Sequence, residues 1–385
     1  MRIAIDAHSI GAKLGGNESY ATNLINALAE IDPVNEYTLY VTTKEASERF
    51  DQKWPNFKVR STLPHTPLIR IPLTLSRELR RNPVDVLHVQ FTSPPFCPCP
   101  AVVSVHDLSF EHLPETFKRR SRTQLRLTVR RSARRAAHVL TLSEHTKRDL
   151  IETYDVHPDC VTAIPIAAPS HFGPVNNAKE LQRVRHIYGI DGDYVLSVGS
   201  IQPRKNLPRL IRAYAALNRE RSENFPKLVL VGKIAWLYDE TLRELEKHGL
   251  KGSVLLTGYV PEADLPALYS GATCFVYPSF FEGFGLPPLE AMKCGVPVIV
   301  GDRTSLPEVV GDAGLKVDPF NVEEISAALS RVLNDSTLRS ELGQRSLVQS
   351  GKFSWLETAR RTLKIYERVV RDHKKVDQRT SDVAS

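Results

Sequence analysis

Residues 273–300 read TCFVYPSFFEGFGLPPLEAMKCGVPVIV, and this stretch decides the fold. It starts with the apolar run Thr273–Tyr277 and ends with a second apolar run, Val296–Val300. Two glycines lie in the loop after the first run, and two adjacent prolines then suit the first turn of a helix that ends near Gly295. Because both runs are apolar at consecutive positions, they predict strands that are buried on both faces of a parallel sheet.

The same alternation of strand and helix runs along the chain and restarts once. In the first half the predicted strands are Arg2–Asp6, Tyr37–Val41, Val84–Gln90, Val102–His106 and Val139–Leu142. In the second half the further strands are Tyr194–Val198, Lys227–Val231 and Val254–Leu256. Helical patterns lie between them, for example at Asn17–Glu30, Leu207–Leu217, Asp239–Lys247 and Val322–Leu333. This alternation predicts an α/β fold with parallel sheets and helices on both faces of each sheet.

The restart falls in a stretch between Ile164 and Lys179 that is rich in proline, glycine and asparagine, which is typical of a linker. We therefore expect two Rossmann-like, doubly wound domains that face each other across a cleft, over residues 1–177 and 178–354. A last helix is expected over 355–373, and a flexible tail over 374–385. Ligands of such sheets bind beyond the carboxyl ends of the strands, so the cleft is the expected active site.

Charge is concentrated in one segment. The chain has 385 residues with 51 Lys+Arg and 44 Asp+Glu, and nine of the basic residues lie in 118–135, which contains no acid. Without them the formal net charge falls from +7 to −2. Apolar residues recur there at helical spacing, so the segment is either a domain helix with a solvated basic face or a contact with anionic lipid. The residues expected to touch such a membrane surface are Arg119, Arg122, Arg126 and Arg130. Nucleic acid is not an expected partner, because the segment lacks aromatic side chains for base stacking.

The composition, with 42% hydrophobic and 25% charged residues, excludes disordered, collagen-like and disulfide-stapled proteins. No run of 18 apolar residues occurs, and Asp6 and His8 interrupt the first apolar run too early for a signal peptide. The five cysteines are scattered apart from Cys97-Pro98-Cys99, which has no second ligand pair, so free thiols are favoured over a zinc site. A reducing, cytoplasmic location is expected.

Three loops carry candidate chemistry. The first strand is followed by Gly15 and Gly16 and then a helix, which suits either the approach of an anion or a plain tight turn. Arg204 and Lys205 follow a buried strand and precede a helix, which suits a diphosphate, although a solvated pair of cations fits the pattern too. In the stretch 273–300, carboxylates stand on either side of the glycine loop and are natural acceptors for sugar hydroxyls.

The sequence around these two carboxylates resembles the signature of a known family. Glu282 and Glu290 are separated by seven residues, with Gly-Phe-Gly after the first and Glu-Ala-Met at the second. The pattern resembles the signature of family-4 glycosyltransferases, which are retaining enzymes of the GT-B fold. The resemblance covers nearly the whole chain and includes Gly15-Gly16, Val105-His106-Asp107, Val198-Gly199, Lys205-Asn206-Leu207, Leu230-Val231-Gly232-Lys233, Gly258-Tyr259-Val260 and Phe353-Ser354-Trp355.

The resemblance implies roles for these positions. His106, Glu282 and Lys205 would be catalytic: His106 and Glu282 would contact the transferred sugar, and Lys205 the phosphate. Glu290 would bind the ribose of the nucleotide. The donor-binding positions it implies are Gly15, Gly16, Ser200, Arg204, Lys205, Tyr259, Val260, Glu282, Gly283, Phe284, Gly285, Leu286 and Glu290. The first domain would take the acceptor and the second the donor, and the last helix would return to the first domain.

Two departures from the family pattern concern the loops. Many members have an arginine after the Val-Gly of the phosphate loop, where this chain has Ser200, so Arg204 is the residue that could replace that charge. The Gly-Gly-Asn-Glu-Ser-Tyr stretch from Gly15 to Tyr20 has unusual neighbours after its glycines, so no acceptor contact is carried over to it.

The expected function is retaining transfer of a hexose, with mannose as the first candidate, from a nucleotide diphosphate sugar. GDP-mannose is the first candidate donor, and a glycan or lipid-linked acceptor in polysaccharide or glycolipid synthesis is the expected partner. No cofactor and no metal are expected, because cations and helix amides can stabilise the leaving diphosphate. A nucleotide-sugar epimerase of the same fold and a non-catalytic sensor are the alternatives. Within the cytoplasm, attachment to the inner face of the membrane is the second expected location.

Overall fold

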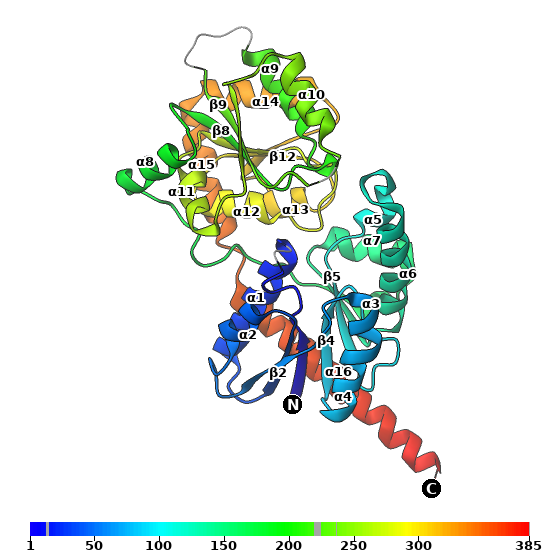
Figure 1. The fold of residues 1–385 in the computed structure, drawn as a ribbon. Helices are drawn as coiled ribbons and strands as arrows, with labels where there is room; N and C mark the ends of the chain where they lie inside the picture. The colour runs from blue at the N-terminus through cyan, green and yellow to red at the C-terminus, as the bar shows by residue number, and fades with distance from the viewer. Residues whose placement is uncertain (13–14, 219–224, 236, 385) are drawn as a thin grey trace. The chain divides into compact units, whose positions relative to one another are not determined.

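The computed structural model of the chain describes residues 1–12, 15–218, 225–235 and 237–384 (Figure 1). The chain forms two compact units. Unit 1 comprises Met1–His112, Lys118–Ile166 and Ser354–Ser385, and unit 2 comprises Leu113–Phe117 and Ala167–Phe353. Both units have a parallel sheet with helices packed on it, as the alternation of strands and helices predicts.

The first boundary between the units lies at Ile166, whereas the sequence places it after residue 177. Residues beyond Ile166 belong to unit 2 because they are bonded to it. The Lys293 ammonium donates hydrogen bonds to the carbonyls of Ala168 and Pro169, at 3.3 and 2.8 Å, and the Val175 amide donates to Ser270 Oγ at 2.9 Å. The proline-rich stretch is therefore a packed part of unit 2.

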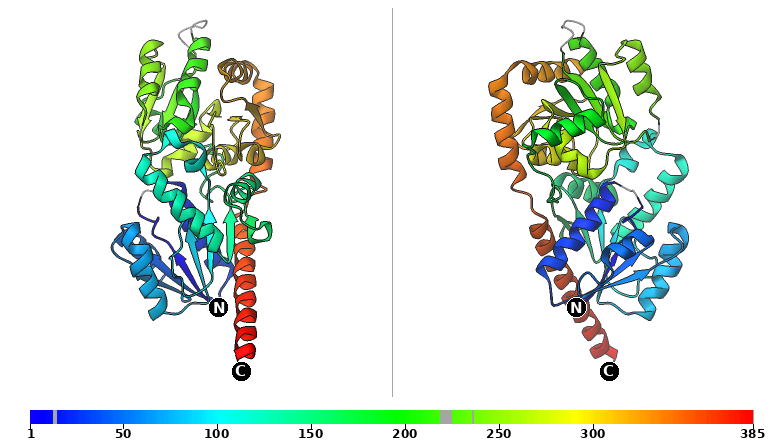
Figure 2. Two further views of the ribbon diagram at one scale, coloured as in Figure 1. Left: turned by 90° about the vertical axis from the view of Figure 1, so that its right-hand side faces the viewer. Right: turned by 60° about the vertical axis from the view of Figure 1, so that its left-hand side comes forward.

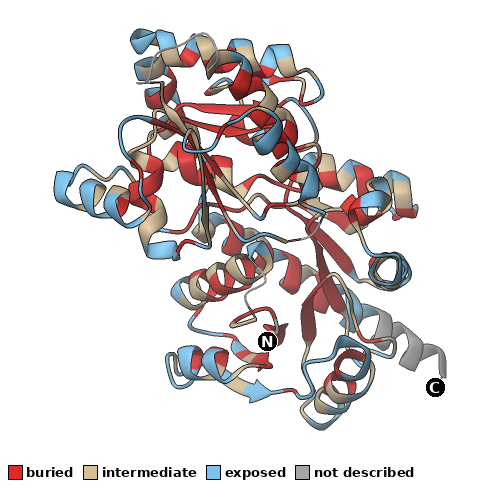
Figure 3. Ribbon diagram, turned by 45° about the horizontal axis from the view of Figure 1, so that its top comes forward, coloured by how far each residue is buried: buried red, intermediate tan, exposed pale blue. Residues whose placement is uncertain are grey.

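Unit 1 is built on a seven-stranded parallel sheet with the order β3-β2-β1-β4-β5-β6-β7. Its strands are β1 (Arg2–Asp6), β2 (Glu36–Val41), β3 (Phe57–Ser61), β4 (Val86–Gln90), β5 (Ala101–Val105), β6 (His138–Thr141) and β7 (Val161–Ala163). All residues of β4, β5 and β6 are buried, including polar ones such as His88, Ser104 and His138, and Figure 3 colours the buried residues of the chain red. The sequence analysis missed β3 and β7 at the two edges.

The helical segments of unit 1 connect these strands. They are α1 (Gly16–Ile31), α2 (Lys44–Phe50), α3 (Pro67–Ile69), the π-helical turn η1 (Arg70–Leu75), α4 (Ser76–Arg81), α5 (Ser109–His112), α6 (Arg119–Arg135), α7 (Glu144–Tyr154), the 3-10 turn η3 (Pro158–Cys160) and α16 (Trp355–Ala384). α6 coincides with the basic segment, and Val129 and Ala133 of its apolar stripe are buried.

Helix α16 belongs to unit 1, although Ala167–Phe353 of unit 2 separates it in the sequence from the other residues of unit 1 (Figure 2). It packs against α1 and β4. Thr358 Oγ1 donates to the Pro165 carbonyl at 2.7 Å, Arg361 donates to the Ala163 carbonyl at 2.6 Å, and the Tyr366 hydroxyl is bonded to the ring of His88. α16 runs to Ala384, beyond the expected end at 373, because no glycine or proline interrupts its sequence.

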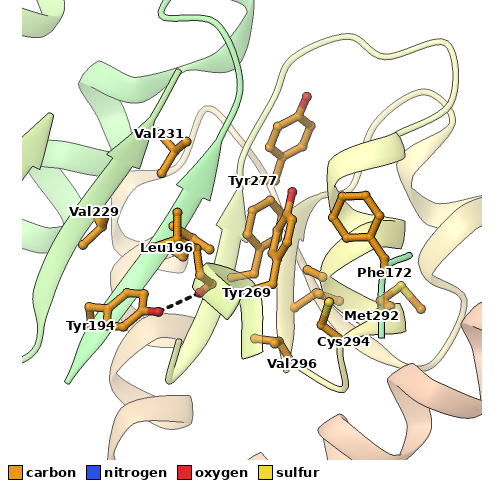
Figure 4. Close-up of a cluster of buried hydrophobic side chains, with 14 of the residues drawn as sticks. Phe172, Tyr194, Leu196, Val229, Val231, Tyr269, Tyr277, Met292, Cys294 and Val296 are labelled. Carbon is orange, nitrogen blue, oxygen red and sulfur yellow. Dashed lines mark hydrogen bonds between the residues drawn. The ribbon is translucent and has the colours of Figure 1, made fainter. Parts of the chain in front are cut away.

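Unit 2 is built on a six-stranded parallel sheet with the order β10-β9-β8-β11-β12-β13. Its strands are β8 (Tyr194–Val198), β9 (Lys227–Val231), β10 (Val254–Gly258), β11 (Cys274–Tyr277), β12 (Val298–Gly301) and β13 (Gly314–Val317). Tyr194 and Leu196 enter one hydrophobic cluster, whereas Val195 between them enters the cluster on the other face. Figure 4 shows the first cluster, in which Tyr269 and Tyr277 lie beside Phe172 and Met292.

The helical segments of unit 2 cover both faces of this sheet. They are the 3-10 turn η2 (Pro114–Thr116), α8 (Ala178–Ile187), the 3-10 turn η4 (Pro203–Lys205), α9 (Leu207–Asn218), α10 (Asp239–Lys247), the 3-10 turn η5 (Glu262–Asp264), α11 (Leu265–Ser270), α12 (Leu286–Lys293), α13 (Leu306–Val310), α14 (Val322–Asn334) and α15 (Ser336–Ser350). Strand β11, helix α12 and strand β12 form the strand–helix–strand unit that residues 273–300 predict.

Candidate active site

Two turns of unit 2 bring charged side chains to the carboxyl ends of β8 and β11. η4 follows β8 and presents Arg204 and Lys205 immediately before α9. Asn206, with a φ of 58°, holds this turn in place. Its side-chain amide donates hydrogen bonds to the carbonyls of Pro278 and Pro319, at 3.0 and 2.6 Å, and so ties the turn to the loop after β11.

Glu282 lies in that loop and is surrounded by hydrogen-bond donors. Lys205 Nζ lies 2.6 Å from Glu282 Oε1, and Arg204 Nη1 lies 3.0 Å from Glu282 Oε2. The hydroxyls of Ser279 and Tyr277 donate to Oε1 at 2.7 and 3.0 Å. The Tyr277 hydroxyl also accepts a hydrogen bond from Lys205, so the tyrosine bridges the cation and the carboxylate.

This cluster holds one carboxylate and two cations, so it has a net positive charge. Burial raises the pKa of Glu282. The charges of Arg204 and Lys205 and the hydrogen bonds from Lys205 and Ser279 lower it by more, so the pKa is about 2. Glu282 is therefore a carboxylate at neutral pH, and it accepts hydrogen bonds without donating any. A buried carboxylate beside a lysine and an arginine can receive sugar hydroxyls while the two cations face a phosphate.

Glu290, on α12, has the opposite electrostatic environment. Burial raises its pKa to about 8, and the negative charge of Glu262 adds to this rise. The hydrogen bond that Tyr269 donates to Glu290 Oε2, at 2.9 Å, lowers the pKa only in part. Glu290 is therefore largely protonated at neutral pH in the free protein, whereas Glu282 is ionised.

The glycine loop between these glutamates is held by the start of α13. Ser305 Oγ donates to the carbonyls of Glu282 and Phe284, both at 2.8 Å. Gly285 has a φ of 112°, and a Cβ atom there would lie 2.7 Å from Leu306 Cδ2, so a side chain would clash. Pro287 and Pro288 have no N–H and the Leu289 amide donates to the Gly285 carbonyl, so the amides of Gly285 and Leu286 are the ones at the start of α12 that are left for an anion.

The other predicted residues of unit 2 differ in how they are placed. Arg204 is paired with Glu282, which puts a cation at the loop that follows β8, whereas Ser200 is exposed. Tyr259 is 64% exposed, and Lys233 Nζ lies 4.8 Å from the centre of its ring. Val260 lies in the hydrophobic core, so only its backbone is available to a ligand.

In unit 1, His106 follows β5 and is 8% exposed. Its Nδ1 lies 2.9 Å from Asn17 Oδ1, and its ring contacts the rings of Tyr20 and Phe91, with centroids 4.7 and 5.1 Å away. Burial lowers the pKa of His106 to about 4, although the charge of Asp107 raises it in part. Because Asn17 Oδ1 accepts, Nδ1 carries the proton, and Nε2 keeps a lone pair that has no partner among the described residues.

The glycine loop of unit 1 lies at the start of α1. Gly15 has a φ of 58° and is the residue before the helix, which begins at Gly16. A Cβ atom at either glycine would meet nothing within 4 Å, so the space beside them is open. Gly15, Gly16 and Asn17 thus lie at one end of α1, and Asn17 joins this end to His106.

The structure brings the predicted residues into two groups, one in each unit. The unit 2 group contains Ser200, Arg204, Lys205, Tyr259, Val260, Glu282, Gly283, Phe284, Gly285, Leu286 and Glu290. The unit 1 group contains Gly15, Gly16 and His106.

The sequence analysis missed several partners in both groups. Tyr277 and Tyr269 are buried residues of the core pattern, and nothing in that pattern shows that their hydroxyls reach the two glutamates. The sequence did set Asn17 apart, because it differs from the residues that usually follow the glycine pair. Arg70 carried none: it is fully buried, and its Nη1 donates to both carboxylate oxygens of Asp6, at 2.8 and 2.9 Å.

Two of the four arginines expected at a membrane contact other residues of unit 1. Arg122 donates to a backbone carbonyl of α5 at 3.1 Å, and Arg126 Nε lies 2.6 Å from Glu111 Oε2. Arg119 and Arg130 are exposed. In the described part of the chain, no helix is long and apolar enough to cross a bilayer, and no group of three or more His, Cys, Asp or Glu side chains is arranged to hold a metal ion.

Comparison with known proteins gives matches over both units. Residues 180–347 match the family model for glycosyl transferases group 1, and residues 14–167 match that for glycosyltransferase family 4. The chain is 37% identical to O-antigen chain mannosyltransferase B of Escherichia coli over 267 residues, which cover 69% of this chain and 70% of that protein.

Two further similarities extend this result. The chain is 34% identical over 245 residues to the serotype-specific mannosyltransferase WbdA of Escherichia coli, and the match covers 63% of this chain but only 30% of WbdA. Its fold is similar to that of WaaG, a glycosyltransferase involved in lipopolysaccharide biosynthesis, with a TM-score of 0.74 and 19% identity. That match covers 95% of this chain and 99% of WaaG.

Proposed function

The chain belongs to the family-4 glycosyltransferases, which have the GT-B fold, and from that premise we propose the reaction that it catalyses. It transfers a hexose from a nucleotide diphosphate sugar to a glycan or lipid-linked acceptor, with retention of the anomeric configuration and without a metal ion. Mannose is the proposed hexose and GDP-mannose the proposed donor, because the two Escherichia coli relatives described above are named mannosyltransferases.

The observation that carries this proposal is the cluster of Glu282 with Lys205 and Arg204. Breakage of the anomeric bond leaves a nucleotide diphosphate with growing negative charge. Lys205, Arg204 and the amides at the start of α12 are preorganised to stabilise that charge, so no metal ion is needed for it. Glu282 stays ionised beside them and accepts hydrogen bonds from the hydroxyls of the sugar.

Protonated or ionised, Glu290 can bind the vicinal hydroxyls of the donor ribose. In its ionised form it accepts from both hydroxyls, whereas its protonated form accepts from one and donates to the other. Tyr269 fixes the orientation of the carboxyl group through Oε2, which leaves Oε1 for the ribose.

The neutral state of His106 constrains how the proton moves. With a pKa of about 4, His106 is a weak base, and its Nε2 is suited to accept a hydrogen bond from a sugar hydroxyl. We assign the acceptor's proton instead to the departing phosphate oxygen. The anomeric carbon–oxygen bond to the phosphate breaks, the bond to the acceptor oxygen forms on the same face, and the acceptor proton passes to the phosphate.

The proposed acceptor is part of a cell-surface polysaccharide or glycolipid, made at the cytoplasmic face of a membrane. α6 would approach that surface through its exposed arginines. Attraction to anionic lipid is about 1 kcal/mol for each arginine near the surface. Arg119→Gln together with Arg130→Gln should therefore weaken cosedimentation with anionic vesicles about 10-fold or more, and unchanged binding would remove α6 from this role.

Product analysis tests the proposed reaction against its two alternatives. The protein is incubated with GDP-mannose and a mannose-terminated oligosaccharide in the presence of EDTA, and nucleotide and sugar products are separated. Release of GDP that depends on the acceptor, with an α-mannoside as product, is the expected result. Conversion of the free donor without an acceptor would identify an epimerase, and binding without turnover would identify a sensor.

A further inference from the structure

A cavity of about 440 Å³ opens in unit 1 at the amino end of β5, between the loop that precedes this strand, the last two turns of α6 and α16. It contains the two sequence features that the proposed reaction leaves unused, namely the end of the basic segment and the Cys97-Pro98-Cys99 turn. Arg131 and Arg135 of α6 and His373 of α16 line it.

The charge around this cavity has one sign. No aspartate or glutamate is among the residues that line it, and neither Arg131 nor Arg135 has an ion-pair partner in the described part of the chain. The two arginines are one helical turn apart, so their like charges repel each other. An anion between them would relieve this repulsion, and a concave surface concentrates the field of the cations on it.

The walls of the cavity are fixed by hydrogen bonds. Thr92 Oγ1 donates to Thr128 Oγ1 at 3.2 Å, and the Ser93 amide donates to Ser132 Oγ at 3.0 Å, which ties the loop to α6. After α6, the Ala137 amide donates to a carbonyl of β5 at 2.9 Å. The cavity therefore exists before a ligand arrives, which lowers the entropic cost of binding one.

Most of the other residues that line the cavity are prolines, alanines and Phe96. Pro94, Pro95 and Phe96 form one wall, and Phe96 is 70% exposed although it is aromatic. A second cavity of about 420 Å³ shares Pro100, Ala137 and His373 with the first, but Asp159 and Asp372 line it, so it has room for the uncharged part of a ligand larger than a phosphate ion. From the cationic and apolar lining, we propose that this cavity binds a phosphate group carried on an apolar or aromatic body, through Arg131 and Arg135.

This site is distinct from the proposed reaction centre. It lies at the amino end of β5, whereas His106 follows the carboxyl end, and the five residues of the strand span about 16 Å. A ligand bound there does not reach the reacting atoms from this side of the sheet. Two sources of such a ligand have the same chemistry: a soluble nucleotide and the phosphate of a membrane isoprenoid.

Alkylation of the thiols in the cavity measures its occupancy. Cys97 and Cys99 line the cavity with their sulfur atoms 3.7 Å apart, and a hydrogen bond from Cys99 lowers the pKa of Cys97, which favours its alkylation. The protein is treated with iodoacetamide in the presence of farnesyl diphosphate, GDP or inorganic diphosphate, and the two sites are quantified by mass spectrometry. Occupancy is expected to slow alkylation at least fivefold.

Two double variants test whether Arg131 and Arg135 are the cause of the protection from alkylation. Arg131→Gln with Arg135→Gln should abolish the protection. Arg119→Gln with Arg120→Gln removes the same charge from the exposed start of α6 and should leave protection intact. Protection by farnesyl diphosphate alone would identify an isoprenoid phosphate, and equal protection by GDP a soluble nucleotide. Loss of protection in both pairs, or no protection of the wild-type thiols by any of the three probes, would overturn the proposal.

The same experiment separates this site from the proposed function. Turnover of GDP-mannose with a soluble acceptor should be unchanged in Arg131→Gln with Arg135→Gln, because neither residue belongs to the reaction centre. An inactive wild-type protein with protected thiols would contradict the proposed reaction and leave the cavity site standing.

Discussion

The carboxyl edges of the two sheets use opposite electrostatics. In unit 2, Glu282 holds Lys205 and Arg204 in a cluster of ions with one positive charge in excess. In unit 1, burial lowers the pKa of His106 to about 4, so its ring is neutral at pH 7. The difference indicates a division of labour: the ionic edge suits a diphosphate, and the neutral edge suits sugar hydroxyls.

Unit 1 does contain an ion pair at this edge, but it is closed to ligands. Arg70 is fully buried, and, against the effect of burial, the contacts of Asp6 with His8 and then with Arg70 hold the pKa of that carboxyl well below its usual range. The pair ties η1 to the end of β1 and has a structural role. Asp107, next to His106, accepts hydrogen bonds from the amide and hydroxyl of Ser109 at 3.0 and 2.7 Å, so the contrast between the edges is that of the Lys205–Arg204 cluster with the neutral ring of His106.

The largest expected effect is that of removing a cation from the ionic edge. Lys205→Ala should lower kcat for hexose transfer by about 10²- to 10³-fold, the usual cost of deleting one preorganised group that stabilises a developing anion. The matched control is Lys227→Ala, which removes a lysine at the start of β9 that is paired with Asp191. Steady-state kinetics with both variants measure the difference. Equal losses would show that the charge of the whole unit matters and not the cluster.

The two glutamates should have opposite effects on stability as pH changes. Glu290 has a folded pKa of about 8 against an ordinary 4.5, so the wild-type protein loses stability as pH rises from 4.5 to 8. Glu290→Gln removes this loss and should raise Tm at pH 8 relative to wild type, but not at pH 4. Glu282 has a folded pKa of about 2, so its contribution is present above 4.5, and Glu282→Gln should lower Tm at pH 7.

The free energies involved are bounded by about 1.4 kcal/mol for each unit of pKa shift, which corresponds to several degrees in Tm. Differential scanning calorimetry at pH 4, 7 and 8 measures them. Shifts of the same sign in both variants at pH 8 would show that the two carboxyl groups do not differ in environment.

The neutral edge should matter for turnover and not for diphosphate binding. His106→Ala removes an acceptor for a sugar hydroxyl, which costs about 1–3 kcal/mol, and should lower kcat about 10- to 100-fold. The affinity for GDP should stay within twofold of wild type. His157→Ala, in an exposed turn of the same unit, is the control. A large loss of GDP affinity in His106→Ala would place the diphosphate at this edge.

The smallest expected effect is that of a variant that raises the pKa of His106 and so tests whether its ring must be neutral. Asn17→Asp puts a carboxylate beside Nδ1, and an opposite charge at this distance raises a histidine pKa by about 1–3 units. Protonated His106 cannot accept a hydrogen bond, so kcat should fall several-fold at pH 6 and recover at pH 8. The pH–rate profile and the imidazole nitrogen chemical shifts report this. A profile that matches wild type would show that Asn17 does not set the proton on His106.

The sequence predicts the fold well where burial is complete. The predicted bounds of β1, β8 and β9 match the strands residue for residue, because a mostly apolar, buried run marks each of them. The edge strand β3 was missed because three of its five residues are exposed and polar. The boundary at Ile166 was missed because nothing in a proline-rich stretch shows that Lys293 will bond to it.

For the site, the sequence identifies the charged residues but not the groups that set their state. The pattern around Glu282 and Glu290 treats both as acceptors, and only the structure gives them pKa values of about 2 and about 8. The pKa of Glu282 is lowered, against the effect of burial, by Arg204 and Lys205, which are far from it in the sequence, whereas burial and the charge of Glu262 raise the pKa of Glu290. Burial and pairing across elements cannot be read from spacing along the chain.

The binding of GDP to wild-type protein, Lys205→Ala and His106→Ala, followed by isothermal titration calorimetry, tests the central claim most directly. The division between an ionic edge and a neutral edge predicts that Lys205→Ala weakens GDP binding at least 10-fold and that His106→Ala leaves it unchanged. Equal weakening in both variants, or weakening in His106→Ala alone, would contradict it.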